Sequence, residues 1–193
     1  MKRFYKIVLL VSVFIVQHAV SVAQAYKVGA NVLNAGVGFG YSIGYVSSAT
    51  TTPVMHVSYE HGLRELGPGT FGIGGVISFQ GATFSESNAF GTYDQRWSAT
   101  YVGLRGTWHP DILVGGEYDV YGALQLGYVN YSYSFNGTGI YSQDAFRVTN
   151  NLSSGVGLGL VVGGRYYFTP KVAAFAELGY DLSYMKIGAA FHL

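Results

Sequence analysis

Apolar residues alternate one by one with glycine, serine and other small or polar residues along most of this sequence. The stretch Val37–Tyr45 shows the pattern clearly, because an apolar or aromatic residue stands at every second position with glycine or serine between. Successive side chains of a β-strand point to opposite faces, so the alternation predicts strands with one apolar face and one small or polar face. Eight stretches show it, at residues 36–45, 55–60, 71–80, 101–108, 117–128, 156–168, 172–180 and 185–193.

The faces opposite the apolar residues hold too little charge to be the surface of a soluble protein. Only 11% of the residues are charged, against about 25% in ordinary soluble domains. A soluble eight-stranded barrel directs its apolar face inward, whereas a membrane barrel directs it outward and keeps small and polar residues inside. We therefore predict an all-β fold, an eight-stranded antiparallel up-and-down transmembrane β-barrel, with a soluble lipocalin-like carrier as an alternative.

Aromatic residues stand at both ends of the predicted strands on the apolar faces. Those expected at the periplasmic lipid interface are Tyr59, Phe71, Trp108, Tyr166, Phe168 and Phe191. The opposite ends carry Tyr45, Phe79, Tyr128 and Tyr180, with mostly aliphatic residues between the two sets. Amphipathic rings favour the headgroup level of a membrane, so the two sets indicate a surface that contacts outer-membrane lipids.

The connections between the predicted strands differ in length. Short ones lie around residues 62–69, 109–116 and 169–171, and longer ones around 46–53, 81–96 and 132–151. Transmembrane barrels have short periplasmic turns and longer extracellular loops, so we expect extracellular loops at 81–96 and 132–151. A hairpin hidden in either loop would raise the number of strands from eight to ten. We expect binding of an extracellular ligand at the loop tips, which carry Asp94, Arg96, Asp144 and Arg147.

Residues 1–25 have the pattern of a secretory signal peptide. Basic residues at positions 2, 3 and 6 precede an apolar run of about ten residues, which is too short to span a bilayer as a helix. The sequence Ala23-Gln24-Ala25 then provides the small-x-small pattern of a cleavage site. We therefore expect export with cleavage after Ala25, and a single domain formed by residues 26–193.

Isolated charged residues lie on the predicted inward faces. They are Glu60, Arg105, Glu117, Asp119, Arg165, Glu177 and Lys186. A tight turn after Asp181 places Glu177 opposite Lys186, and Arg165 is expected diagonal to Glu177. An unpaired buried charge costs several kcal/mol. We therefore interpret Arg105, Arg165, Glu177, Lys186 and Glu60 as an ion-pair network that fills the lumen, with a narrow ion or small-solute channel as an alternative.

His56, Ser58 and Glu60 share one face of one predicted strand. A lipid-modifying outer-membrane enzyme could use a histidine and a serine in this way to attack an acyl ester, and we keep that function as an alternative. Side chains two positions apart on a strand are too far apart for an assured hydrogen bond, so we interpret these residues as polar lumen lining. We predict no catalytic site, no metal site and no cofactor. The low charge and the formal net charge of +1 exclude a basic nucleic-acid-binding protein.

Over about residues 26–193 the chain resembles the outer-membrane protein β-barrel domain family, the small eight-stranded barrels of Gram-negative envelopes, and three stretches carry the resemblance. The stretches are the glycine-alternating residues 36–44, the sequence Tyr-Val-Gly-Leu-Arg-Gly at 101–106, and the closing pair 176–180 and 185–193. The resemblance implies a non-enzymatic protein of the cell outer membrane with a structural or adhesion-like role through extracellular loops. It also implies periplasmic chaperones and the barrel-insertion machinery as partners during assembly.

Overall fold

The computed structural model describes residues 26–40, 48–112, 116–142 and 153–193, so the predicted signal peptide lies outside the described residues. The strands are β1 (Asn31–Phe39), β2 (Thr50–Thr51), β3 (Val54–Glu65), β4 (Gly69–Asn88), β5 (Gly91–Pro110), β6 (Tyr118–Gly137), β7 (Gly155–Thr169), β8 (Val172–Tyr180) and β9 (Met185–His192), and one short 3₁₀ helix is η1 (Gly139–Ser142). Within these ranges no helix has the length and apolar character needed to cross a membrane.

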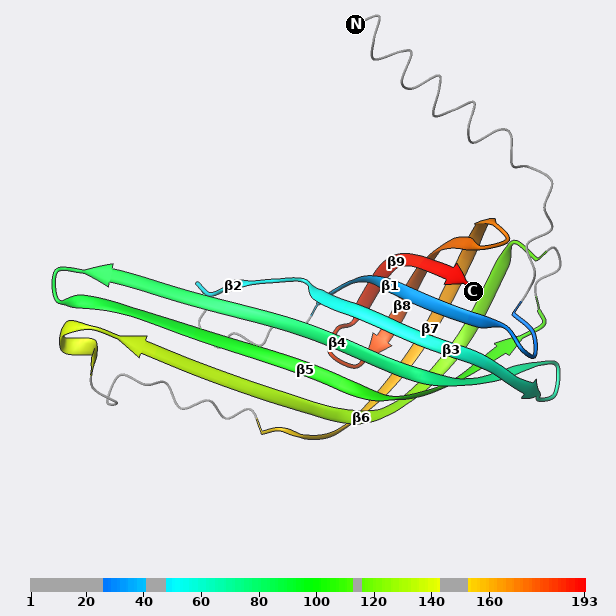
Figure 1. The fold of residues 1–193 in the computed structure, drawn as a ribbon, viewed down its shortest axis with the longest axis horizontal. Helices are drawn as coiled ribbons and strands as arrows, with labels where there is room; N and C mark the ends of the chain where they lie inside the picture. Colours follow the sequence, from blue (N-terminus) through cyan, green and yellow to red (C-terminus); the bar gives the residue numbers. More distant parts are fainter. Residues whose placement is uncertain (1–25, 41–47, 113–115, 143–152) are drawn as a thin grey trace, which may run out of the picture.

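Eight of the strands form a closed antiparallel barrel. The order of neighbours is β4-β3-β1-β9-β8-β7-β6-β5, and pairing of β5 with β4 closes the ring. The first and last strands therefore meet, with Val32 of β1 opposite His192 of β9. The two-residue β2 lies beside β4, where Thr50 is opposite Thr83 (Figure 1). The predicted fold class is confirmed, and the number of barrel strands is eight.

The apolar side chains face outward. On β7, Val156, Leu158, Leu160 and Val162 are 65 to 78% exposed, whereas Val161 between them is 1% exposed. Among the described residues, half of the buried side chains are polar or charged; they include His56, Glu60, Arg105, Gln125, Arg165, Glu177 and Lys186. A closed sheet satisfies its backbone hydrogen bonds within itself, which allows this apolar outer surface to face hydrocarbon. The arrangement excludes the soluble lipocalin-like carrier.

Three neighbouring strands are much longer than a membrane span requires. Strands β4, β5 and β6 have 20 residues each, whereas a tilted strand crosses hydrocarbon with about 9–11 residues. In Figure 1 they run to the left, far past the ends of the other barrel strands. They remain paired along this extension, with Glu86 of β4 opposite Tyr93 of β5, and Tyr93 opposite Gly137 of β6.

The prediction of loops at 81–96 and 132–151 is therefore wrong at residues 81–88, 91–96 and 132–137, which belong to strands, while residues 143–151 lie outside the described residues. The β4–β5 connection is only Ala89-Phe90, and β6 continues to Gly137. Frequent serine, threonine and asparagine suggested a loop, but these residues alternate with aromatic ones and occupy one face of a sheet. Because the hidden hairpin continues two strands already counted, it adds no barrel strand. Asp144 and Arg147 lie outside the described residues.

The first strand begins earlier than predicted. Its alternation suggested a start near Gly36, whereas β1 spans Asn31–Phe39, and the predicted continuation to Tyr45 lies outside the described residues. The inward side chain of Val32 is fully buried and belongs to an apolar cluster with Tyr167 and Phe175. Apolar residues thus lie on both faces at the start of β1, which hides the alternation.

Candidate functional site

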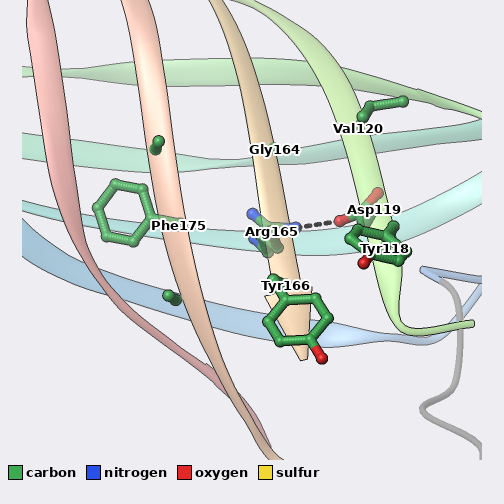
Figure 2. A pocket seen from close by; sticks show the side chains of 9 residues that line it. Tyr118, Asp119, Val120, Gly164, Arg165, Tyr166 and Phe175 are labelled. Atoms are coloured by element: carbon green, nitrogen blue, oxygen red, sulfur yellow. Dashed lines mark hydrogen bonds and ion pairs between the residues drawn. The ribbon is translucent and has the colours of Figure 1, made fainter. Parts of the chain in front are cut away.

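The barrel interior near the short turns holds a cluster of four ionisable side chains. Arg165 of β7 forms ion pairs with Glu60 of β3 and, through Nη1 at 2.7 Å, with Asp119 of β6. The imidazole of His109 lies between the two carboxylates, with Nδ1 2.8 Å from Asp119 and Nε2 3.4 Å from Glu60. The Nε of Arg165 also donates to the amide oxygen of Asn34 at 3.1 Å. The cluster thus joins four strands across the barrel, and Figure 2 shows the pairing of Arg165 with Asp119.

A second cluster lies closer to the other end of the barrel. Glu177 of β8 accepts from Arg105 at 2.5 Å and from Lys186 at 3.3 Å, and Lys186 also contacts Asp181 at 2.6 Å. All four side chains are at most 2% exposed. Two cations and two carboxylates balance in charge, which reduces the cost of burying them.

Tyr121 of β6 connects the two clusters. Its hydroxyl donates to Glu177 at 2.9 Å, and its ring centre lies 4.4 Å from the Arg165 guanidinium and 5.4 Å from that of Arg105. A cation over a tyrosine face is attracted by the ring quadrupole. One buried side chain therefore contacts both arginines as well as the central carboxylate.

We expect replacement of Tyr121 by phenylalanine to lower the free energy of unfolding by about 1.5–3 kcal/mol, because a buried hydrogen bond to a charged group is lost. The matched control is Tyr118→Phe, since Tyr118 is 53% exposed on the outer face of the same strand. Urea unfolding of the purified barrel in detergent measures both values. Equal midpoints for the two variants would contradict this role of the Tyr121 hydroxyl.

Packed side chains occupy both ends of the interior. At the short-turn end, the ring of Tyr26 stacks on His109, with ring centres 3.7 Å apart. At the other end, Leu182 from the β8–β9 turn packs with Trp97 and Tyr101 in a buried apolar cluster. The charged clusters therefore lie between Tyr26 at one end and this apolar cluster at the other, an arrangement that favours a structural role for them.

The sequence analysis identified most of the charged residues that face inward, but not all of their ion-pair partners. Arg165 lies diagonal to Glu177 in the strand register, yet its ion pairs are with Glu60 and Asp119. His109 was missed, because residues 109–116 were expected to be a short connection, whereas β5 continues to Pro110 and directs the His109 side chain inward. Glu117, expected to point inward, is exposed and precedes the first residue of β6.

The residues weighed for hydrolysis are buried and bonded to other partners. Nδ1 of His56 lies 2.9 Å from the hydroxyl of Ser78, and the hydroxyl of Ser58 accepts from Asn34 at 3.0 Å. His56 and Ser58 are each 1% exposed, so neither is open to a substrate. Among the residues that the structure describes, no group of histidine, cysteine and acidic side chains could hold a metal ion.

The aromatic residues expected at the periplasmic interface lie on the outer face near the short turns. Phe71 is half-buried, and the others are 39 to 58% exposed: Tyr59, Trp108, Tyr166, Phe168 and Phe191. The Tyr59 hydroxyl donates to Asn31 at 2.7 Å, and the Trp108 indole donates to the Leu66 carbonyl at 3.1 Å. Both acceptors are near this end of the barrel, so the rings lie over the apolar wall with their polar atoms toward the turns.

Beyond the apolar band, β4–β6 form what we call the surface sheet: residues 80–88, 91–100 and 130–137, with β2 at the edge. The outward face changes from apolar to polar at one level, since Phe79 is followed by Gly81 and Thr83, and Tyr128 by Asn130. On this face the outward residues are short and polar: Thr83, Ser85, Ser87, Thr92, Asp94, Arg96, Ser98, Thr100, Asn130, Ser132, Ser134 and Asn136. Asp94 and Arg96, predicted at a loop tip, are thus part of a strand. The change marks where the membrane-facing surface ends.

The opposite face of the surface sheet is aromatic. Tyr93 contacts Phe84, Phe135 and Tyr141, with ring centres 5.7, 6.3 and 5.0 Å apart. Closer to the barrel, Trp97 packs on Tyr133 at 5.6 Å. These contacts connect three strands and η1, and the rings of Phe84, Tyr93 and Phe135 remain partly exposed.

The surface sheet carries little charge. Its only charged residues are Glu86, Asp94 and Arg96. Glu86 accepts from the Tyr93 hydroxyl at 3.0 Å, and Asp94 accepts from the Ser85 hydroxyl at 2.5 Å. Partial burial and the bond to Glu86 raise the pKa of Tyr93, because both disfavour the phenolate. The acidic side chains are therefore engaged within the sheet, and Arg96 is exposed.

The fold is similar to that of Ail, the attachment invasion locus protein of Yersinia pestis. A crystal structure of Ail in complex with the heparin analogue sucrose octasulfate matches with a TM-score of 0.50 and 15% sequence identity, over 86% of this chain and 99% of that chain. A second crystal structure of Ail matches with a TM-score of 0.38 and 13% identity over the same shares of the two chains. No protein-family model matches the chain, and no curated protein does. The comparison with the first Ail structure shows that this chain has the fold of an eight-stranded membrane barrel.

Proposed function

We propose that this chain is an integral, non-enzymatic protein of the Gram-negative outer membrane that recognises an extracellular ligand through the surface sheet. The observation that carries the proposal is the extension of β4, β5 and β6 beyond the apolar band. A sheet of this length is not needed to cross the membrane, and beyond the apolar band its outward face is polar. Rigid projecting elements with exposed aromatic and hydroxyl groups are suited to binding, since little conformational entropy is lost there.

The similarity to Ail supports an adhesion-like role, but the charge of the surface sheet favours a different ligand chemistry. A sulfated polyanion such as the analogue in the Ail complex requires several basic groups, whereas the surface sheet holds one arginine and two acidic residues. Partly exposed tyrosine and phenylalanine rings stack on apolar faces, and hydroxyl and amide groups form hydrogen bonds. We therefore propose an uncharged ligand surface, such as a neutral glycan or the apolar face of a host protein.

Removal of the surface hairpin tests this function. A variant in which residues 83–96 are replaced by Asn-Gly joins Ala82 to Trp97, which are opposite each other in the β4–β5 pair. We expect this variant to fold as a barrel and to lose binding to host cells and to immobilised matrix proteins and glycans. Binding by the intact protein should change little with salt, since ion pairs contribute little.

The matched controls separate binding from folding and from charge. Heat-modifiable migration in detergent gels shows whether the shortened barrel is folded, and Arg96→Met tests the single basic residue. Retained binding by the folded, shortened variant would contradict the proposal. Binding that heparin displaces and that Arg96→Met abolishes would instead favour a polyanionic ligand.

A further inference from the structure

The outer surface of the barrel is hollowed near its short-turn end. A groove with a volume of about 360 Å³ lies over β6, β7 and β8 (Figure 2). Its floor is formed by Gly164 of β7 and by Ala174 and Ala176 of β8. Gly164 is directly opposite Ala176, and Tyr166 is opposite Ala174, so the small residues lie side by side on the outer face.

Larger apolar side chains border this floor. The rings of Tyr118 and Tyr166 lie opposite each other with centres 5.1 Å apart, and Val120 is opposite Gly164. On the next row, Val162 and Leu178 project from the wall and are more than 60% exposed. The groove is therefore a recess between an aromatic ridge and an aliphatic ridge.

The groove presents no charged side chain. Asp119, Arg165 and Phe175 contribute to its lining, but their side chains are buried at 6%, 2% and 3% exposure. Asp119 and Arg165 form their ion pair within the barrel. The surface offered to an occupant is thus apolar, with the phenol groups of the two tyrosines at one end.

We infer that this groove binds one acyl chain of a glycerophospholipid from the leaflet next to the short turns. The groove is continuous with the apolar band, so in the membrane it is in contact with hydrocarbon. In that setting an occupant is held by close packing, because apolar surface is not being removed from water. A flexible chain can contact the floor and both ridges at once, and tyrosine rings at the headgroup level mark where its polar end leaves the hydrocarbon.

The test fills the groove with a side chain and leaves the barrel intact. A Cβ at Gly164 would meet only the Asp119 carbonyl oxygen at 3.7 Å and Val120 Cγ1 at 3.9 Å, so Gly164→Leu is sterically tolerated. The matched control is Gly75→Leu on β4, where a Cβ would meet only the Gly103 carbonyl oxygen at 3.6 Å. Heat-modifiable migration confirms that each variant is folded.

Two measurements test whether a phospholipid occupies the groove. Native mass spectrometry after detergent exchange should show one phospholipid retained by the unmodified protein. In vesicles of phosphatidylethanolamine and phosphatidylglycerol, a phospholipid with a photoactivatable acyl chain should label the groove more than the rest of the band. We expect Gly164→Leu to reduce retention and labelling about tenfold, equivalent to the loss of roughly ten carbon–carbon contacts, and Gly75→Leu to leave both unchanged.

Several results would overturn the inference. No retained lipid, uniform labelling around the barrel, or equal loss in the two variants would show that the groove holds only the general lipid annulus. A dimer that Gly164→Leu dissociates would show that a second copy of the chain occupies the groove.

Discussion

Replacement of Arg165 by methionine should lower the free energy of unfolding by about 3–5 kcal/mol, because breaking a buried ion pair leaves uncompensated charge. Arg165 is fully buried and contacts Glu60 and Asp119, so its loss leaves two carboxylates facing each other with only His109 between them. Urea unfolding in detergent, followed by tryptophan fluorescence and by gel migration, measures the change.

Two further variants distinguish charge from packing at this position. Arg96→Met removes an exposed arginine from the surface sheet and should change stability by less than about 0.5 kcal/mol. Combining Arg165→Met with Glu60→Gln and Asp119→Asn removes the unpaired charges and should recover more than half of the loss. An Arg165→Met protein as stable as the parent would contradict the structural role of this cluster.

Replacement of Gly188 by valine is expected to prevent closure of the barrel. Gly188 of β9 is directly opposite Gly36 of β1, in the one pair that joins the first and last barrel strands. A Cβ at Gly188 would contact the Ala35 carbonyl oxygen, and it would lie 2.5 Å from Gly36 Cα and 2.7 Å from the Phe175 ring. Backbone atoms cannot give way as a flexible side chain can, so β1 and β9 would be forced apart. The folded, heat-modifiable band should be absent, and the chain should be degraded in cells.

The matched control is a valine substitution at the neighbouring residue, Ala189. Ala189 is half-buried on the outer face, so Ala189→Val places the same added side chain toward lipid and should assemble normally. Normal assembly of Gly188→Val would mean that the closing pair is wider than the structure shows.

The barrel could be predicted from the sequence because its alternation is local. Each strand has its own apolar face, and a closed membrane sheet is the arrangement that places all such faces in lipid. The ends of the strands were predicted less accurately than the strands themselves. Val32 interrupts the pattern at the start of β1, and beyond Phe79 the polar and apolar faces of β4 exchange sides.

Some contacts of the charged clusters could be predicted from the sequence, and others could not. The register of Glu177 opposite Lys186 follows from one tight hairpin. The contact of Arg105 with Glu177 crosses the barrel between residues 72 positions apart, so it depends on strand tilt and stagger rather than on any local pattern. The surface sheet was mistaken for loops because composition was weighed above alternation: Tyr131, Tyr133 and Phe135 keep a period of two through the polar stretch.

The unbroken length of β4 and β5 has a mechanical consequence. Twenty residues at about 3.3 Å each form ribbons roughly 65 Å long that reach from the short turns to the distal tip. A pull applied at the tip would load many interstrand hydrogen bonds in shear at once, with no hinge along the way. Tension on a bound partner would therefore pass directly into the barrel wall, and the attachment should resist force better than a tether through a flexible connection.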